Sequence, residues 1–349
     1  MPFNTSSPRH YRLIIFGTTL IGLALSLSLA WHAEQSARAT ENKRMQLLAS
    51  EIGHAITIHF EHLAHDLSNI RALWAASKSV ERGEFRAMIE NADQLRNMTG
   101  TLGVGYIKRV QQTELPLFLD QTRADEAPQF TLKNTSAAPE FSIVKFIEPY
   151  AINAGIEGFD LGQEPASQAA CERAMRTGEA TMTPLITLEE RTPKPFGVRL
   201  FLAVYKKQSS LKTPEERHDV LLGWTYLAVE TAAIFSELDN LHPELDFTIT
   251  DPINGTAQPP LYASAAMPPA PLAPYQSIPI NIGEHEWTLT FTKNAAFIAT
   301  PRNTVYIIAL GGPIITLLLV GFLSSLLRTN LKANELAARM TAELSTAVS

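Results

Sequence analysis

The chain has very little cysteine, and it has no surplus of positive charge. Cys171 is the single cysteine among 349 residues, so no disulfide can form within the chain. The 29 lysines and arginines are outnumbered by 35 aspartates and glutamates, which gives a net charge of −6 and no basic cluster of the kind that binds nucleic acid. We therefore expect no nucleic-acid partner and a fold held by its buried core alone.

Enzyme signatures are also missing. The sequence has no Gly-x-Ser-x-Gly motif and no phosphate-binding Walker loop, and Gly100, Gly103 and Gly105 lack the context of a dinucleotide site. Glu189 and Glu190 follow a predicted strand, where neighbouring side chains point to opposite faces, so they do not form a catalytic carboxylate pair. We predict no catalytic residue and no cofactor, with a membrane-anchored periplasmic hydrolase as the alternative function.

Two long apolar runs stand near the ends of the chain. Residues 13–31 and 305–327 contain no charged side chain, and as helices they would extend roughly 28 and 34 Å, enough to cross a bilayer. Arg9 and Arg12 precede the first run and Arg328 follows the second, which places both termini in the cytoplasm. We expect a two-pass protein of the bacterial inner membrane with residues 32–303 in the periplasm; a cleaved signal peptide is the alternative for the first run.

The segment after the first run has the pattern of one long helix, residues 33–77. No proline interrupts it, and its apolar residues recur every three or four positions: Met45, Leu48, Ile52, Ile56, Phe60, Leu63, Leu67, Ile70 and Trp74. Such a helix reaches about 65 Å, which indicates a stalk against which two units pack and along which a second copy binds. The histidines of this segment, His54, His59, His62 and His65, diverge around the helix, so we predict no metal site.

Shorter elements fill the rest of the central region. Patterning predicts helices at 84–97, 165–177 (ended by Gly178) and 231–238, a charged linker at 206–219, and strands at 103–110, 129–134, 141–148, 182–188, 197–205, 220–229, 247–250, 261–263 and 287–292. Residues 251–279 contain eight prolines and are expected to form an exposed loop around the short strand at 261–263. The final strand should lead directly into the second span.

Four segments in order resemble the CHASE sensor domain of bacterial receptor kinases, cyclases and plant cytokinin receptors: FIEPYAINAGIEGFDLG, ACERAMRTGEATMTPLITLEE, FGVRLFLAVYKK and VLLGWTYLAVE. The resemblance covers roughly residues 70 to 240. It implies an α+β fold in which a long stalk helix carries two PAS-like antiparallel-sheet units. It also implies a small-molecule ligand in the membrane-distal unit, a homodimer, and signal transmission to a histidine kinase or diguanylate cyclase.

The resulting domain prediction divides the chain into consecutive parts. These are a cytoplasmic terminus 1–12, span 13–31, stalk 33–77, membrane-distal unit 78–208, membrane-proximal unit 219–298, span 305–327 and a cytoplasmic signalling helix 328–349. The last part is too short for a kinase or cyclase. We expect either a longer receptor of which this is a piece or a separate output protein.

Ligand contacts are predicted on the strand at 197–205. One face of this strand is aliphatic, and the other carries Arg199, Phe201, Ala203 and Tyr205, a cation with two aromatics. Arg199 could therefore bind an anionic ligand through its planar guanidinium, or it could make a surface ion pair.

The family resemblance adds further positions. Residues that contact the hormone in the plant members correspond to Ser167, Leu188 and Phe201, of which only the leucine is retained, so cytokinin binding is not expected here. Thr183 matches a family threonine near the pocket, although a buried strand threonine often only satisfies the backbone.

Overall fold

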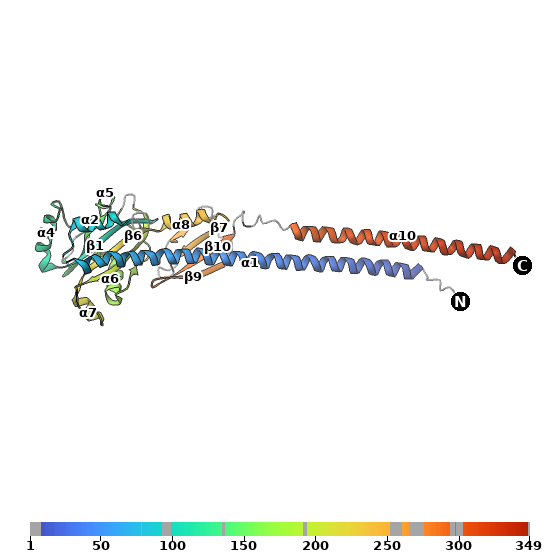
Figure 1. Ribbon diagram of the computed structural model, residues 1–349, viewed down its shortest axis with the longest axis horizontal. Helices are drawn as coiled ribbons and strands as arrows, with labels where there is room; N and C mark the ends of the chain where they lie inside the picture. The colour runs from blue at the N-terminus through green and yellow to red at the C-terminus, as the bar shows by residue number, and fades with distance from the viewer. Residues whose placement is uncertain are drawn as a thin grey trace. The chain divides into compact units, whose positions relative to one another are not determined.

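The computed structural model describes residues 8–77, 79–92, 99–134, 137–190, 194–251, 260–264, 276–293, 297 and 303–347. The chain divides into two compact units, residues 1–48 with 299–349 and residues 49–298. Helix α1 (Pro8–Ala76) contributes to both units, and α10 (Asn303–Ala347) belongs to the first (Figure 1).

The first unit pairs the two apolar segments. Both predicted spans lie within helices that are long and apolar enough to cross a membrane, at Arg12–Ala76 and Val305–Ala337. A Cβ atom added to Gly22 would collide with Thr316, and one added to Gly312 would collide with Ser26. Small residues that allow such close approach are typical of helix packing in lipid.

The second unit contains two antiparallel sheets. The larger has six strands: β1 (Thr101–Gln111), β2 (Glu140–Glu148), β3 (Thr181–Met182), β4 (Ile186–Thr187), β5 (Phe196–Tyr205) and β6 (Leu221–Glu230). Their order is β2-β1-β6-β5-β3, with β4 also paired to β5. The smaller sheet has the order β8-β7-β10-β9 and consists of β7 (Leu245–Thr250), β8 (Tyr262–Ala263), β9 (Gln276–Ile282) and β10 (His285–Lys293).

The position of β6 corrects the domain prediction. The sequence predicts that residues 219–229 belong to the membrane-proximal unit, but β6 lies between β1 and β5 in the six-stranded sheet. A strand's partners depend on register and burial across the sheet, and a linker on its N-terminal side does not determine them. The four-stranded sheet therefore follows α8 (Thr231–Leu241), which begins where β6 ends.

Helix α1 packs against both sheets. The ring of Phe60 meets that of Trp287 of β10 edge to face at 5.2 Å, and about four turns further along the helix the ring of Trp74 lies 4.3 Å from that of Tyr106 of β1. The α+β architecture with a long helix and two sheets is therefore confirmed. The apolar stripe is buried by this same chain from Ile52 to Ile70, which contradicts the expectation that it leaves a seam for a second copy.

Several local predictions differ from the structure. Residues 129–134 form no strand; Phe130 instead packs edge to face on Phe118 of α4 (Leu115–Ala124), and its carbonyl accepts a hydrogen bond from Arg123. The strand predicted at 182–188 is split into β3 and β4, the linker contains α7 (Pro214–Asp219), and the expected loop 251–279 includes the first residues of β9. Residues 93–97 of the predicted helix and 294–296 before the second span lie outside the described residues.

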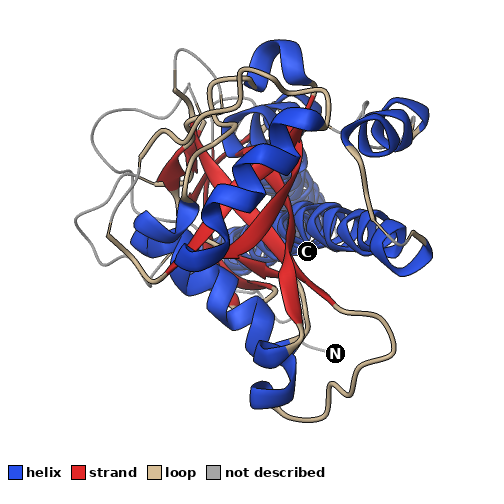
Figure 2. Cartoon of the chain, turned by 90° about the vertical axis from the view of Figure 1, so that its left-hand side faces the viewer, coloured by secondary structure: helices blue, strands red, loops and turns tan. Residues whose placement is uncertain are grey.

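The six-stranded sheet is covered on both faces (Figure 2). One face packs on α1 and on α2 (Arg82–Asn91), through Tyr106, Phe146 and Phe85. The other face carries α6 (Pro165–Thr177), and a core forms there around Phe201 and Tyr226. Three short elements complete this part of the chain: η1 (Gln112–Glu114), α5 (Tyr150–Asn153) and η2 (Leu161–Gln163). Gly178 ends α6 with a φ of +78°, as its position predicts.

Candidate ligand-binding site

Arg199 lies on the α6 face of the six-stranded sheet and is completely buried. Its guanidinium donates to both oxygens of Glu190, at 2.7 Å from Nε and 3.2 Å from Nη2. Nη1 also binds Glu164, at the start of α6, and the hydroxyl of Ser167 at 3.1 Å. Two carboxylates of the protein therefore already neutralise the cation.

This arrangement removes the basis for an anionic ligand at Arg199. Burial alone would lower the pKa of the guanidinium, but Glu190 and Glu164 with Tyr226 together outweigh that effect and keep the pKa above its ordinary value. The alternative of a surface ion pair is also wrong, because Arg199 and Glu190 are both fully buried. Four of the five donors of the guanidinium are used within the protein.

The other predicted contacts are distributed unevenly. Phe201 is buried and stacks on Tyr226 with ring centroids 6.1 Å apart, and Leu188 is buried beside Gly197. Thr183 accepts a hydrogen bond from the amide of Arg199 at 3.0 Å, which is a backbone role. Tyr205 does not join the others, because its hydroxyl donates to the carbonyl of Met175 in α6.

Two unpartnered polar atoms mark the site that the sequence did not reveal. Asn153 donates from its amide nitrogen to the carbonyls of Leu102 and Pro149, which fixes its orientation and leaves Oδ1 buried without a partner among the described residues. The hydroxyl of Tyr226 is likewise buried and unpartnered. An unsatisfied buried polar atom costs about 1–3 kcal/mol, so each indicates a missing hydrogen-bond partner.

The glycines of β1 make room for these two side chains on one face of the strand. A Cβ on Gly105 would overlap the ring of Tyr226, and one on Gly103 would lie 3.1 Å from the amide nitrogen of Asn153. Positions two residues apart on a strand share a face and are separated by roughly 7 Å. The amide and the phenol therefore lie over neighbouring positions of the same strand.

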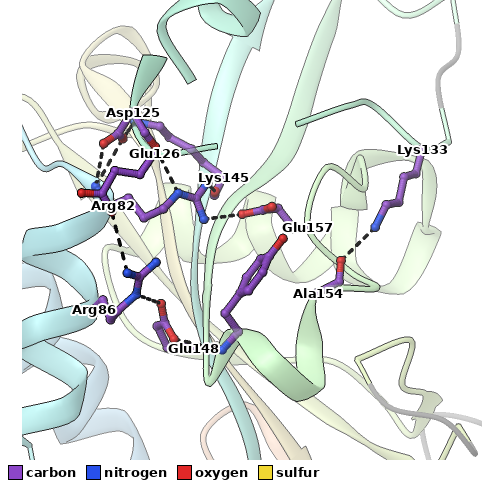
Figure 3. A network of polar contacts seen from close by, with 10 residues as sticks. Arg82, Arg86, Asp125, Glu126, Lys133, Lys145, Glu148, Ala154 and Glu157 are labelled. Atoms are coloured by element: carbon purple, nitrogen blue, oxygen red, sulfur yellow. Dashed lines mark hydrogen bonds and ion pairs between the residues drawn. The ribbon is translucent and has the colours of Figure 1, made fainter. Parts of the chain in front are cut away.

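A charged network connects α2 to the segments around Glu148 and Glu157 (Figure 3). Arg82 of α2 binds Glu157 at 2.6 Å and donates to Asp125, while Arg86 binds Glu148 at 3.2 Å. Burial raises the pKa of Tyr226 well above its ordinary value, and the charges of Glu190 and Glu157 add to that shift while Arg199 opposes it. The phenol is therefore neutral.

A cavity of about 380 Å³ lies further along the same face. Trp224, two residues before Tyr226 on β6, lines it together with Met175, and Gln163 and Gln168 contribute amide groups. Its volume falls within the roughly 300–1,000 Å³ of small-molecule sites. Trp224 and Tyr226 belong to one core cluster, so the wall of the cavity continues to Tyr226 through this core.

Sequence analysis missed Glu190, Asn153 and Tyr226 for different reasons. Glu189 and Glu190 do diverge as predicted, with Glu189 binding Lys194, but we dismissed both because neither could form a catalytic pair. Glu190 points inward and faces Arg199 of the same β4-β5 hairpin. The opposite charges of these two residues, nine positions apart in the sequence, are a signal that could have predicted the pair. The unpartnered atoms have no sequence signal, because they depend on three segments that meet only in the fold.

No metal centre is placed by the described residues, where no group of three or more His, Cys, Asp or Glu is arranged to hold an ion. His54, His62 and His65 are exposed on α1 and His59 is half-buried. Burial lowers the pKa of His59, with Glu237 opposing that effect.

Comparisons with known structures find chemoreceptor sensory domains. The periplasmic sensory domain of the Campylobacter jejuni chemoreceptor Tlp1 has 11% identity and a TM-score of 0.47 and covers 75% of this chain and 99% of its own. Methyl-accepting chemotaxis protein X has 12% identity and a TM-score of 0.42 over the same shares. The ligand-binding domain of the Pseudomonas aeruginosa PAO1 amino acid chemoreceptor PctC, solved in complex with GABA, has 12% identity and a TM-score of 0.38 and covers 70% and 96%. A search of curated proteins finds no match.

The sequence itself gives the family. The profile of the CHASE domain matches residues 78–262, more than half of the chain. This range contains the six-stranded sheet, the Arg199 pairs and both unpartnered atoms. It is an extracellular sensor domain, which points to sensing rather than catalysis, and it lies between two candidate membrane helices. The chain belongs to the CHASE domain family.

Proposed function

We propose that the protein is a two-pass inner-membrane receptor whose periplasmic domain binds a small molecule at Asn153 and Tyr226. The observation that carries this proposal is the pair of buried, unpartnered atoms Oδ1 and Oη over β1. Asn153 and Tyr226 are the two such residues that lie over neighbouring positions of β1, and a bound ligand supplies the partners that the protein omits.

The hydrogen-bonding capacity of the two atoms determines which groups the ligand must carry. Oδ1 of Asn153 can only accept a hydrogen bond, and the hydroxyl of Tyr226 accepts or donates one. Among the charges that act on Tyr226, Glu190 and Glu157 outnumber Arg199. The proposed ligand therefore presents an N–H donor, on an ammonium or amide group, and an apolar or planar body that packs near Phe201.

Arg199 holds the wall of this site. It connects Glu164 and Ser167 at the start of α6 to Glu190 in the β4-β5 hairpin. Ser167, Leu188, Phe201 and Thr183 thus remain in the proposal as wall residues, and Tyr205 as an anchor of α6. Ligand binding would change the position of α6 relative to the sheet.

Signal output requires a further component. We infer that the change reaches the membrane through β10 and α10 and controls a histidine kinase or diguanylate cyclase, in the same polypeptide or as a separate partner. The proposal includes the homodimer that the family resemblance implies. Cross-linking of cysteines introduced one at a time along the exposed positions of α1, at Glu51 and His54, tests that dimer directly.

A thermal-shift screen tests the ligand chemistry. Full-length protein in detergent is exposed to pairs of compounds that share a carbon skeleton and differ in carrying an ammonium, an amide or a carboxylate. A ligand at about 100 times its Kd stabilises the folded state by about 2.7 kcal/mol, so hits are detectable. We expect hits among the donors and none among the carboxylates that lack a donor; hits confined to those carboxylates would contradict the proposal.

A further inference from the structure

A buried histidine in the β9-β10 hairpin is hydrogen-bonded to groups of both sheets. The ring of His285, the first residue of β10, is buried, with Nδ1 3.0 Å from Oδ2 of Asp251 and Nε2 3.0 Å from the backbone carbonyl of Met182. Met182 belongs to β3 of the six-stranded sheet, and Asp251 follows β7 of the four-stranded sheet. One imidazole therefore bridges both sheets.

Both partners of the ring are hydrogen-bond acceptors. A carbonyl oxygen cannot donate, and neither can an ionised carboxylate. A neutral imidazole has one N–H and satisfies only one of the two contacts, so the bridge is complete only when an extra proton is held by the His285–Asp251 pair. When that proton leaves, one of the two hydrogen bonds is lost, and at that contact the unprotonated ring nitrogen and its partner oxygen are both acceptors.

Charged groups surround the bridge on each element packed against it. Arg173 of α6 donates to the same Met182 carbonyl at 2.9 Å and binds Glu284 of the hairpin at 3.0 Å. Asp251 approaches from the end of β7, and Glu61 of α1 lines the cavity of about 260 Å³ that lies beside Met182 and Gly283. Arg173 and Glu284 offset each other, so the proton shared by His285 and Asp251 is the charge on which the bridge depends.

We propose that the His285 bridge is a proton-dependent clasp between the two sheets, which makes the coupling of the distal unit to the membrane-proximal sheet sensitive to periplasmic pH. The clasp is closed with the proton bound and opens on the Met182 side as the pH rises. The cavity beside it gives the hairpin room to move. This inference does not depend on the ligand proposed for Asn153 and Tyr226.

The test compares pH profiles of full-length protein in detergent micelles. The thermal unfolding midpoint is measured between about pH 5.5 and 8.5, the range in which imidazoles titrate, for the wild type and His285→Gln. Glutamine retains an N–H donor for the Met182 carbonyl and carries no titrating proton. We expect the wild type to lose about 2–4 °C relative to His285→Gln as the pH rises across this range.

Two further variants secure the interpretation. His218→Gln, at an exposed histidine of α7, should keep the wild-type profile. Asp251→Asn, which keeps the ring and removes its acid partner, should flatten the profile and carries the test if His285→Gln fails to fold. Superimposable profiles of the wild type and of whichever of these two variants folds would overturn the proposal.

Discussion

Glu190 and Arg199 form a bidentate ion pair in which both side chains are excluded from solvent. Removing one partner leaves the other charge buried, which typically costs about 3–5 kcal/mol. We therefore predict that Arg199→Ala unfolds or strongly destabilises the domain, measured as the midpoint of chemical denaturation. The double variant Arg199→Met with Glu190→Leu should be far more stable than either single change, and a stable, fully folded Arg199→Ala would contradict this account of the pair.

Tyr226→Phe removes one unpartnered atom and leaves the ring that packs over Gly105. The variant should be as stable as the wild type or more stable by about 1 kcal/mol, because a buried unsatisfied hydroxyl is lost. Binding of any screened ligand should weaken at the same time, measured by calorimetric titration.

The matched control for that change is Tyr205→Phe. Its hydroxyl donates to the Met175 carbonyl at 2.7 Å, so its loss should lower stability by about 1 kcal/mol and leave ligand affinity unchanged. If both tyrosine variants changed affinity equally, Tyr226 would have no special contact with the ligand.

Gly105→Ala tests the close approach between β1 and Tyr226. The added methyl group occupies the space of the phenol ring and also meets the carbonyl of Phe146 at 2.7 Å. Overpacking of this kind costs typically about 1–3 kcal/mol, so the free energy of unfolding, measured by chemical denaturation, should fall by about that amount. Gly155→Ala, with its nearest atom at 4.0 Å, is the control that should cost much less.

His59 gives a pH prediction of the opposite sign to the His285 clasp. Burial lowers the pKa of His59 below its ordinary value of 6.5, so the folded chain binds this proton less readily than the unfolded chain. Its contribution to stability is present above the unfolded pKa and is lost as the pH falls through the lower folded pKa. His59→Leu should therefore reduce the acid-side loss in unfolding midpoint, whereas His54→Leu, at an exposed position of α1, should leave it in place.

The membrane topology is tested by reporter fusions. The arginines beside both apolar segments predict that a reporter joined at Asn303 is active outside the inner membrane and one joined after Arg328 is active inside. Cytoplasmic activity of the Asn303 fusion would exclude a periplasmic sensor between the two helices.

Periodic elements of this fold were predictable, and contacts between distant segments were not. The alternation of β5 and the glycine after α6 correspond to local structure, because side-chain period and the left-handed preference of glycine act within a few residues. The partners of β6 and the pairing of Glu190 with Arg199 depend on which segments meet in the fold. The predicted boundary before β6 and the prediction that Arg199 is available to an anionic ligand were therefore both wrong. Asn153 and Tyr226 are ordinary residues in the sequence and become a candidate site only where the sheet leaves them without partners.

The most direct test of the central claim is a structure of the full-length protein with a hit from the thermal-shift screen bound. The account predicts an N–H group of the ligand within about 2.7–3.2 Å of Oδ1 of Asn153, with the hydroxyl of Tyr226 also bound to the ligand. A ligand held in the cavity beside Trp224 with both atoms still unpartnered, or one that displaces Glu190 to bind Arg199 through a carboxylate, would contradict it.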